Sequence, residues 1–421
     1  MRFDLRYGAG SLPLESPERK TLDVLVPVIV DDTNYIERKI VNAIEKPIDS
    51  ESLSQIVSHA YSVAVVVNGD PDIETIPLLL NTLLENLQTS LSGPTELLVI
   101  YPTDSQKAES LSDVSKRLGI HEKEGYQLIL QDAKSNENLS YIGETPTYCT
   151  PIHVNKAFLD AEVKIGIGAI RSNIFTGATG GRMSVLPHCC GIKSILRNTK
   201  LQATQSVGPF VTDSAACVDL EEASRLACLD FIVNTIPDWT NNLNEIVAGN
   251  PYTAWERGVS LARNMTETFF KHKADIAIVS AGGSNNDRTL FDAVDALYAG
   301  KEATEYGGVI VLVAECADGI GSDGFLRGVS ESSSSKEVAL LAETGFEMGM
   351  EKSRFFWDIL NSRKVIICSR LRESLIEERF HCSAVRDPQE GYELARSLIV
   401  SSPSIAVIPH GIRTLPVMRN G

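Results

Sequence analysis

The residues best suited to chemistry lie in a glycine-rich segment that directly follows an apolar run. Residues 167–182 leave a stretch of Ile, Gly and Ala and end in Gly177-Ala178-Thr179-Gly180-Gly181-Arg182. Glycines let a backbone approach a ligand and expose N–H groups to an anion, and arginine adds a planar cation that suits phosphate or carboxylate. A tight turn without a ligand would use the same glycines, and the segment matches neither the Walker motif nor the dinucleotide fingerprint.

Two further loops of this kind follow apolar runs later in the chain. They are Ser280–Asp287, in which Asn286 or Asp287 could cap the next helix, and Glu315–Phe325. Ligands of open α/β sheets gather at the carboxyl ends of strands. We therefore predict that Gly177–Arg182 forms an anion site, with Arg182 as the cation, and that it faces Gly282 and Gly283 across a cleft between two domains. The residues that we expect to bind substrate are Gly282, Gly283, Asp287 and Arg288.

The sequence His188-Cys189-Cys190 offers two kinds of soft-metal ligand. Adjacent residues rarely aim at one ion, however, and no second Cys/His cluster completes a tetrahedral set. We interpret the segment as the start of a helix with partly buried thiols, and we expect no metal there. The remaining histidines show no spacing typical of a Ser-His-Asp or Cys-His catalytic set.

Apolar runs that suit buried strands alternate with segments of helical periodicity along most of the chain. The expected strands are 63–67, 97–101, 126–130, 163–170, 231–236, 276–279, 309–313, 365–368 and 405–408. The expected helices include 75–87, 105–118, 290–297, 336–344 and 391–398, and a connector that starts with Asn250 as N-cap and Pro251 and runs to about Lys273. This alternation predicts an α/β protein of two domains, 1–255 and 256–421, each a mostly parallel Rossmann-like sheet flanked by helices.

Composition limits the classes of partner. Among 421 residues, 55 are acidic and 39 basic, which gives a formal net charge of -16 and argues against a nucleic acid or an anionic membrane as a partner. The first residues carry charge and form no apolar segment of the kind that a signal peptide needs. The eight cysteines are irregularly spaced, which is typical of reduced thiols. We expect a cytoplasmic protein whose partner is a small carboxylate or a nucleotide.

Motifs spread over nearly the whole chain resemble the lactate racemase family, whose members isomerise 2-hydroxy acids with a nickel-pincer nucleotide. The motifs that carry the resemblance are Leu5-Arg6-Tyr7-Gly8, residues 43–50 (AIEKPIDS), residues 150–156 (TPIHVNK), residues 175–187 (FTGATGGRMSVLP), residues 315–321 (ECADGIG) and residues 407–411 (VIPHG). The resemblance implies two α/β domains with cofactor and substrate between them. It also implies that the cofactor is bound by Asp70, Ser172, Thr176, Gly177, Thr179, Gly180, Gly181 and Arg182.

The same resemblance implies a reaction for which this chain lacks the expected side chains. In the family, hydride passes from the substrate to the cofactor, two histidines handle the hydroxyl proton, a lysine tethers the cofactor and a further histidine ligates nickel. Here Met183 occupies the lysine position, Asn173 and either Thr103 or Asp104 occupy the two histidine positions, and Thr199 occupies the nickel-ligand position. Methionine has no amine, asparagine does not exchange a proton near neutral pH, and threonine is a weak nickel ligand.

Two functions agree with this pattern. One is a 2-hydroxy-acid racemase or epimerase with a changed substrate or cofactor attachment, which would use Asp70, Asp104, Arg182, His188 or Asp287 as substitutes. The other is a non-catalytic binding or regulatory protein on the same fold, because function resides in the site and not in the fold. Under either function we expect no ordinary lactate racemisation and no covalent cofactor at position 183.

Overall fold

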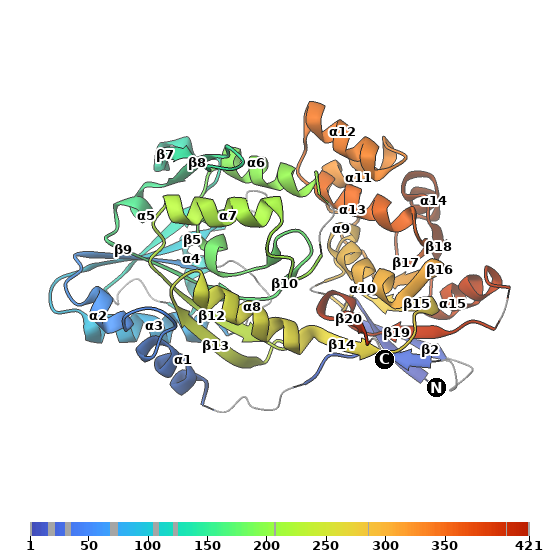
Figure 1. Ribbon diagram of the computed structural model, residues 1–421, viewed down its shortest axis with the longest axis horizontal. Helices are drawn as coiled ribbons and strands as arrows, with labels where there is room; N and C mark the ends of the chain where they lie inside the picture. The colour runs from blue at the N-terminus through green and yellow to red at the C-terminus, as the bar shows by residue number, and fades with distance from the viewer. Residues whose placement is uncertain are drawn as a thin grey trace. The chain divides into compact units, whose positions relative to one another are not determined.

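A computed structural model describes residues 2–15, 22–29, 35–67, 75–103, 109–120, 125–205, 208–284, 286–400 and 402–419. The chain divides into two compact units (Figure 1). The N-terminal unit comprises Ile29–Leu201 and Pro209–Asn264, and the C-terminal unit comprises Met1–Val28, Gln202–Gly208 and Met265–Gly421. No helix among the described residues is long and apolar enough to cross a membrane.

The division differs from the expected domains 1–255 and 256–421 at the start of the chain. The described part of residues 1–28 belongs to the C-terminal unit, because β3 (Leu22–Val24) pairs with β19 (Ile405–Ile408). The hairpin of β1 (Arg2–Tyr7) and β2 (Gly10–Glu15) adds Leu5 and Leu14 to the same unit's core. Phe3, Leu5 and Tyr7 alternate with polar residues as in a half-buried strand, but this pattern does not say which distant sheet the segment joins, so the sequence could not assign it to a unit.

The N-terminal unit is built on a six-stranded sheet in the order β13-β12-β9-β4-β5-β6. The five strands from β12 to β6 in this order run parallel, and the edge strand β13 runs antiparallel to β12. The strands are β4 (Ser62–Val67), β5 (Glu96–Pro102), β6 (Gln127–Gln131), β9 (Val163–Ala169), β12 (Phe231–Pro237) and β13 (Leu243–Gly249). Two small hairpins join them, β7 (Leu139–Glu144) with β8 (Pro151–Asn155), and β10 (Ser172–Asn173) with β11 (Gly177–Ala178).

Helices cover both faces of this sheet. One face packs against α1 (Ile36–Glu45), α2 (Leu53–Val57), α3 (Ile76–Ser90) and α4 (Leu111–Leu118), whose buried Ile, Leu and Val side chains form one core with alternate residues of β4, β5 and β9. The opposite face carries η3 (Gly181–Ser184), which contacts β9, β12 and α7 (Ala215–Leu226). The other helices are η2 (Asn136–Asn138), α5 (Lys156–Asp160), α6 (Ile192–Gln202) and α8 (Thr253–Thr266).

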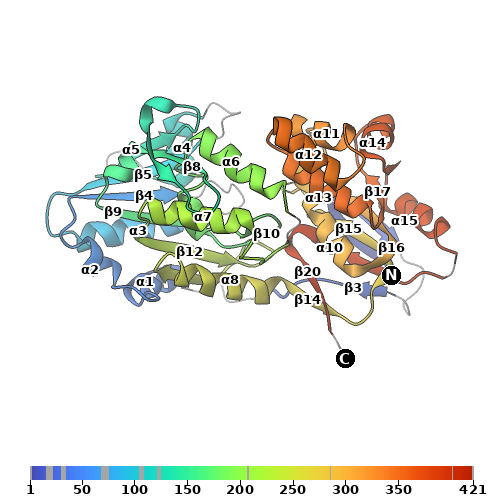
Figure 2. The ribbon, with the colours of Figure 1, turned by 45° about the horizontal axis from the view of Figure 1, so that its top comes forward.

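The C-terminal unit contains a fully parallel sheet in the order β18-β17-β16-β15-β19-β3. Its central strands are β15 (Ala274–Ser280), β16 (Thr304–Val313) and β17 (Lys364–Cys368), with β18 (Ser383–Val385) at the edge. A short parallel pair, β14 (Glu267–Phe270) and β20 (Leu415–Met418), lies beside it (Figure 2). Alternate residues of the large sheet pack with the N-terminal hairpin and α15 (Pro388–Ser397).

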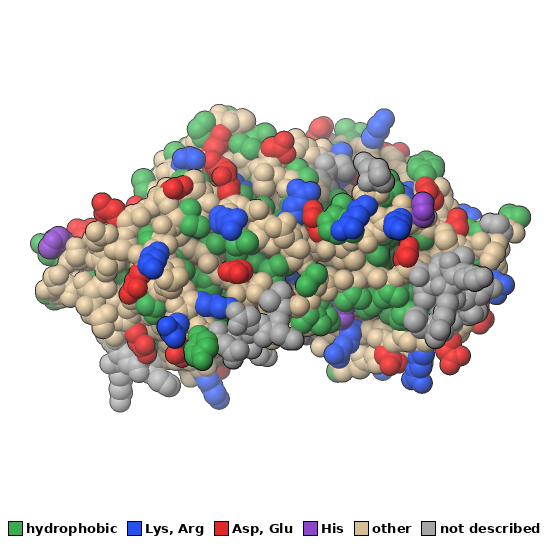
Figure 3. Space-filling model, turned by 60° about the horizontal axis from the view of Figure 1, so that its bottom comes forward, with side chains coloured by type: hydrophobic (Ala, Val, Ile, Leu, Met, Phe, Trp, Pro, Cys, Tyr) green, Lys and Arg blue, Asp and Glu red, His purple; other side chains and the backbone are tan. Residues whose placement is uncertain are grey.

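The opposite face of this sheet contacts α10 (Leu297–Ala303) and α13 (Met350–Leu360). The remaining helices are α9 (Leu290–Ala293), η4 (Val294–Ala296), α11 (Asp323–Ser330), α12 (Ser335–Gly345), α14 (Glu373–Phe380) and η5 (Gly411–Arg413). On the face of the molecule in Figure 3, acidic and basic side chains are interspersed, and basic side chains form no continuous patch among the described residues.

The predicted α/β fold with parallel sheets flanked by helices is confirmed, and each of the nine expected strands is present with shifts of one or two residues, except that β16 starts five residues earlier. Two helix predictions need correction. The connector helix ends at Thr266 and not near Lys273, because residues 267–270 pair with β20 as a strand. The expected helix 290–297 is divided into α9, η4 and the start of α10. Of the expected helix 105–118, residues 105–108 lie outside the described residues, and α4 begins at Leu111 with Ser110 as its N-cap.

Candidate functional site

Each of the two large sheets has a topological switch point, where successive strands are added on opposite sides of the starting strand. A glycine-rich loop lies at the switch point of each sheet. In the N-terminal unit the order reverses between β4 and β9, and the segment with Gly177–Arg182 follows β9. In the C-terminal unit it reverses between β15 and β19, and the loop with Gly282 and Gly283 follows β15. Ligands of open parallel sheets bind outside the carboxyl ends of the strands at such points. Strand order, which no local pattern gives, therefore supports both loops as candidate sites, each within its own unit.

The glycines of the first loop are needed by the protein's own packing. A Cβ atom at Gly177 would lie 2.3 Å from the carbonyl oxygen of Val211, and one at Gly181 would lie 2.5 Å from the ring of Trp255. Gly177, Gly180 and Gly181 all have positive φ angles, of 74°, 79° and 52°. An L side chain at these positions would therefore be strained and crowded without any ligand. The tight-turn interpretation thus explains these glycines by itself.

Thr179 and Ser172 hold the same loop against the sheet. The hydroxyl of Thr179 donates to the carbonyl of Ala169 at 2.8 Å and accepts the N–H of Arg171 at 3.0 Å. Ser172 pairs with Ala178 in the β10–β11 hairpin. These contacts make the segment rigid, which is a requirement for a pre-formed binding loop as well as for a structural turn.

Arg182 does not offer a free cation, which corrects the predicted anion site. Its side chain is buried, with Nη1 3.1 Å from Glu221 Oε2 and Nη2 2.7 Å from Cys217 Sγ. The guanidinium also stacks on Trp255, with Cζ 3.7 Å from the ring centroid. Burial lowers the pKa of Arg182, and the Cys217 and Glu221 side chains oppose that shift. A buried guanidinium with two of its nitrogens already engaged has less capacity to bind a further anion, and these contacts give Arg182 a structural role whatever it contributes to a ligand.

Polar atoms near this loop nevertheless lack partners within the described protein. They are Thr176 Oγ1, Asn234 Nδ2 and Asp238 Oδ2, and each residue is no more than 3% exposed. Asn234 Oδ1 accepts the N–H of Gly181 at 3.1 Å, which places Asn234 directly beside the loop. Buried polar atoms are normally hydrogen-bonded, and exceptions often mark a site for water, an ion or a ligand. Arg182 Nε is likewise buried without a partner among the described residues. These four atoms are the polar groups beside the loop with remaining capacity to bind.

The four positions that carry chemistry in the family resemblance hold side chains engaged in local structure. Thr103 donates both its N–H and its hydroxyl to the carbonyl of Gln131, each at 3.0 Å. Asn173 Oδ1 accepts the N–H groups of Phe175 and Thr176, each at 2.9 Å, and Thr199 Oγ1 donates to the carbonyl of Ile195 at 2.9 Å. Met183 is half-buried in η3. Asp70 and Asp104 lie outside the described residues.

The His188-Cys189-Cys190 segment precedes a helix, as predicted, since α6 begins at Ile192. Both thiols are fully buried, more than the partial burial expected, and burial raises the pKa of Cys189 and of Cys190. Thiols with raised pKa stay protonated near neutral pH and are poor ligands and nucleophiles. Among the described residues, no group of three or more His, Cys, Asp or Glu side chains is placed to hold a metal ion.

In the C-terminal unit, Asp287 joins three segments at the second glycine loop. Its Oδ2 accepts the N–H groups of Gly8 at 2.8 Å and of Glu315 at 3.1 Å. Gly283 accepts the N–H of Asp287 through its carbonyl at 3.0 Å, and its φ of 92° favours glycine. Asp287 is fully buried, and its Oδ1 has no hydrogen-bond partner among the described residues. A carboxylate that ties together a hairpin turn and two loops has a structural role, whatever it contributes to a ligand.

The other expected substrate residues are placed differently. The N–H of Gly282 donates to the hydroxyl of Ser280 at 3.1 Å, so this donor is used within the loop. Arg288 is exposed and paired with Asp318, with Nε 2.9 Å from Oδ2. The neighbouring strand β19 ends at Ile408, and in the turn after it lies His410, whose pKa is lowered to about 4 by burial and by the nearby Arg6. A histidine with this pKa is neutral at pH 7.

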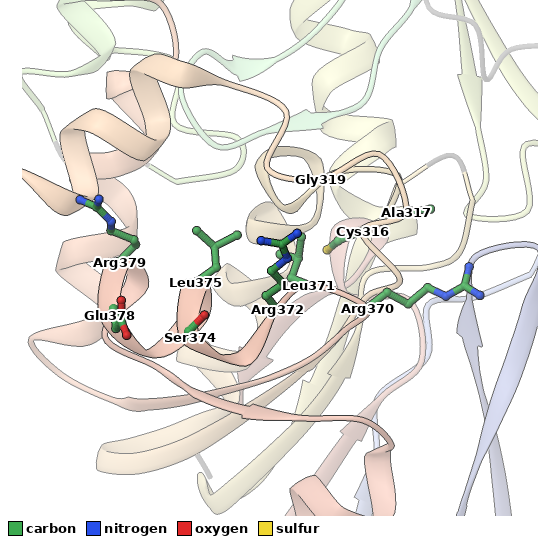
Figure 4. Close-up of a pocket in the computed structure, with 10 residues that line it drawn as sticks. All are labelled: Cys316, Ala317, Gly319, Arg370, Leu371, Arg372, Ser374, Leu375, Glu378 and Arg379. Carbon is green, nitrogen blue, oxygen red and sulfur yellow. The ribbon is translucent and has the colours of Figure 1, made fainter.

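A cavity lies between the loops that follow β16 and β17. The first of these is the glycine-rich loop Glu315–Phe325 of the sequence analysis, and the second was not predicted. Figure 4 shows the lining of the cavity, which includes Cys316, Arg370, Arg372, Leu375 and Arg379. The signal of the second loop in the sequence is the run Ser369-Arg370-Leu371-Arg372, which directly follows the apolar strand that ends at Cys368. That run has no glycine, and for this reason a search for glycine-rich loops passed over it.

Comparison with known proteins agrees with this architecture. A family model described as the lactate racemase N-terminal domain matches residues 7–208, and one described as the lactate racemase C-terminal domain matches residues 270–415. The chain belongs to the lactate racemase family. It is 25% identical to the lactate racemase of Thermoanaerobacterium thermosaccharolyticum over 98% of both chains, and 23% identical to that of Lactiplantibacillus plantarum over 97% of this chain and 98% of the relative.

Solved structures share the fold of this lactate racemase family member. The lactate racemase apoprotein of T. thermosaccharolyticum superimposes with a TM-score of 0.86 over the whole of both chains at 23% identity. A crystal structure of a Thermotoga maritima protein gives a TM-score of 0.64 at 14% identity, over 91% of this chain and 98% of the other. At these identities the likeness concerns the fold.

The side chains at the family's chemical positions do not fit a lysine-tethered nickel cofactor. Met183 offers a thioether where an amine is needed for the covalent link. Thr199 offers a hydroxyl that already donates to its own helix, and hydroxyl oxygen is a weaker ligand for nickel than imidazole. No step of a reaction is therefore derived through this cofactor.

Proposed function

We propose that this protein binds a small carboxylate or a nucleotide on the lactate racemase scaffold and does not interconvert D- and L-lactate. One observation carries the proposal: the side chains that occupy the family's chemical positions serve the local structure. The hydroxyls of Thr103 and Thr199 donate to backbone carbonyls, and Asn173 accepts two backbone N–H groups. None of the three is a general acid or base near neutral pH.

The missing acid–base groups would lower a racemisation rate severely. A positioned general acid or base typically contributes a factor of roughly 10² to 10⁴. Binding is supported separately by the buried polar atoms of Thr176, Asn234 and Asp238, which retain capacity for hydrogen bonds at the point where the sheet order reverses. The chain lacks the expected acid–base side chains but keeps polar groups that could bind a ligand. This combination favours a binding or regulatory protein over a 2-hydroxy-acid isomerase of altered specificity.

The test uses the full chain produced in cells that make the nickel-pincer nucleotide. We expect no detectable interconversion of the lactate enantiomers in a chiral assay and no nucleotide-sized adduct on the peptide that contains Met183. Calorimetric titration with lactate, with a longer 2-hydroxy acid and with a nucleotide should detect binding of at least one. Robust racemisation, or an adduct at position 183, would overturn the proposal.

Substitution toward the family pattern gives a matched comparison. Met183→Lys alone should allow an adduct to form, since this half-buried position carries no side-chain hydrogen bond. Asn173→His should destabilise the loop by about 1 to 2 kcal/mol, because imidazole cannot accept both N–H groups that Asn173 Oδ1 accepts. An Asn173→His variant as stable as wild type would show that the loop is not built around asparagine.

A further inference from the structure

The C-terminal unit contains a cavity of about 690 Å³ that is lined by neither the Gly177–Arg182 loop nor the loop with Gly282 and Gly283. It lies where the chain leaves β16 and β17, so its walls are loops at the carboxyl ends of parallel strands. The segment Arg370–Arg372 and the helix α14 form one side, and Cys316, Ala317 and Gly319 form the other (Figure 4). Its volume falls within the range of small-molecule sites, which is about 300 to 1,000 Å³.

Three side chains form a stripe along this cavity. Leu375 and Arg379 are four residues apart and lie on one face of α14, and Arg372 is the N-cap residue that directly precedes the helix. Figure 4 shows all three on the same side of the helix, with Ser374 and Glu378 on the other. A rise of 1.5 Å per residue places the two arginine Cα atoms roughly 10 Å apart. The stripe thus presents two cations separated by an apolar side chain.

The charges of Arg372 and Arg379 are not neutralised by any carboxylate among the described residues. Neither guanidinium forms a hydrogen bond or an ion pair with any residue in the part of the chain that the structure describes, and both side chains are exposed. Arg370 differs, because its Nη1 lies 2.8 Å from Glu315 Oε1 and its side chain extends away from Arg372 in Figure 4. Glu378 is the one carboxylate in the lining. The cavity therefore has an excess of positive charge even though the whole chain is strongly acidic.

Backbone geometry at the wall supports a built site. Cys316 has a φ of 53°, in the left-handed region that a non-glycine residue rarely adopts, and it is held there by the bond from its N–H to the carbonyl of Asp287 at 2.8 Å. Such strain persists only where the surroundings impose it, and it is concentrated at functional sites. The start of α14 has no side-chain cap, so its first N–H groups add positive potential at the Arg372 end.

We infer that this cavity binds a small molecule with two anionic groups, one held by Arg372 at the start of α14 and one by Arg379, with its middle against Leu375. Guanidinium pairs with phosphate and carboxylate alike, so the two groups are phosphates or carboxylates. The inference concerns the C-terminal unit only and holds whether or not the N-terminal unit is catalytic. It differs from binding of lactate, which has a single anionic group.

Calorimetric titration of the full chain with two probes tests the inference and identifies the source of the charge. Fructose 1,6-bisphosphate carries two phosphates and adipate carries two carboxylates, while glycerol 3-phosphate and acetate provide controls with one anionic group. We expect one of the two probes to bind at least about tenfold more tightly than its control, on the scale of a charged hydrogen bond. Tighter binding of the bisphosphate assigns phosphates, and tighter binding of adipate assigns carboxylates.

Variants identify the site. Arg372→Gln and Arg379→Gln should each lower the affinity for the tighter-binding probe by about tenfold or more. Arg396→Gln, which changes an exposed arginine on α15, should leave this affinity unchanged. Arg372→Lys keeps the charge but loses the planar fork, so an intermediate affinity is expected. These exposed positions should tolerate substitution, and circular dichroism checks the fold. Failure of both probes to bind, equal binding of their controls, or an equal loss in Arg396→Gln would overturn the inference.

Discussion

Arg182 in the N-terminal unit and Arg372 in the C-terminal unit both follow a buried strand of a parallel sheet, yet their charges are used in opposite ways. Arg182 is buried against Trp255 and paired with Glu221, whereas Arg372 is exposed beside a cavity and has no partner among the described residues. The glycine-rich context that made Arg182 the more attractive anion ligand also allowed the turn that buries it. An arginine near a strand end indicates a ligand only when no carboxylate of the protein already neutralises it.

The largest expected effect comes from removing the buried arginine. Arg182→Ala should lower the free energy of unfolding by about 2 to 4 kcal/mol, since it leaves a void beside Trp255 and removes a buried guanidinium that pairs with the partly exposed Glu221. Urea denaturation measures the change. Arg225→Ala is the matched control, because Arg225 pairs with the same Glu221 at 2.8 Å but is exposed, and exposed pairs contribute less than about 1 kcal/mol. Equal losses in the two variants would contradict the contrast between buried and exposed arginines.

A smaller effect concerns pH and the buried charges of the C-terminal unit. Burial raises the pKa of Glu351 from 4.5 to about 7, and this glutamate lies next to Lys352, whose Nζ is 2.8 Å from Asp295 Oδ1. The folded state holds the Glu351 proton more tightly than the unfolded state. The contribution of this group to the free energy of unfolding is therefore fully present below pH 4.5 and is lost as pH rises through 7. The difference in stability between wild type and Glu351→Gln should therefore fall by about 2 to 3 kcal/mol between pH 4.5 and 7.

Denaturation at several pH values measures this difference, with the exposed Glu377→Gln as a control for the change of residue type. The amide oxygen of glutamine can still accept the N–H of Gly349, which Glu351 Oε2 accepts at 2.8 Å, so the variant removes the titration and keeps the contact. A difference that stays constant with pH would show that Glu351 does not hold a proton in the folded protein near pH 6.

The smallest effect is expected at Arg288, the predicted substrate ligand. Arg288→Ala should change the free energy of unfolding by less than about 1 kcal/mol, because both partners of the Arg288–Asp318 pair are about half exposed. A fold of unchanged stability lets any change in affinity for a 2-hydroxy acid be assigned to the side chain itself. A loss of stability comparable to that of Arg182→Ala would place Arg288 among the structural arginines.

The order of these effects follows burial. The sequence alone could not say which of Arg182, Arg288 and Arg372 contributes most to stability and which is available to a ligand. Each follows a strand, and the three side chains are chemically identical. The partners that decide between them, Glu221 with Trp255 for Arg182 and Asp318 for Arg288, are brought close by the fold from other segments.

The sequence by itself determined the strands, because near-continuous apolar runs such as Val63–Val67 and Val309–Val313 can be buried only between two layers of helices. Its motifs also indicated the family, which the two family models confirm. These are local properties that each segment carries with it.

Only the tertiary structure decided what cannot be read from one segment at a time. Pairing of Leu22–Val24 with β19 assigned the start of the chain to the C-terminal unit, and the strand order placed both glycine-rich loops where the sheets reverse. The fold also buried the charge of Arg182 and left those of Arg372 and Arg379 without a partner among the described residues, beside a cavity. The physical reason is that solvation and pairing of a charge depend on every segment that packs around it, and not on its own neighbours in the sequence.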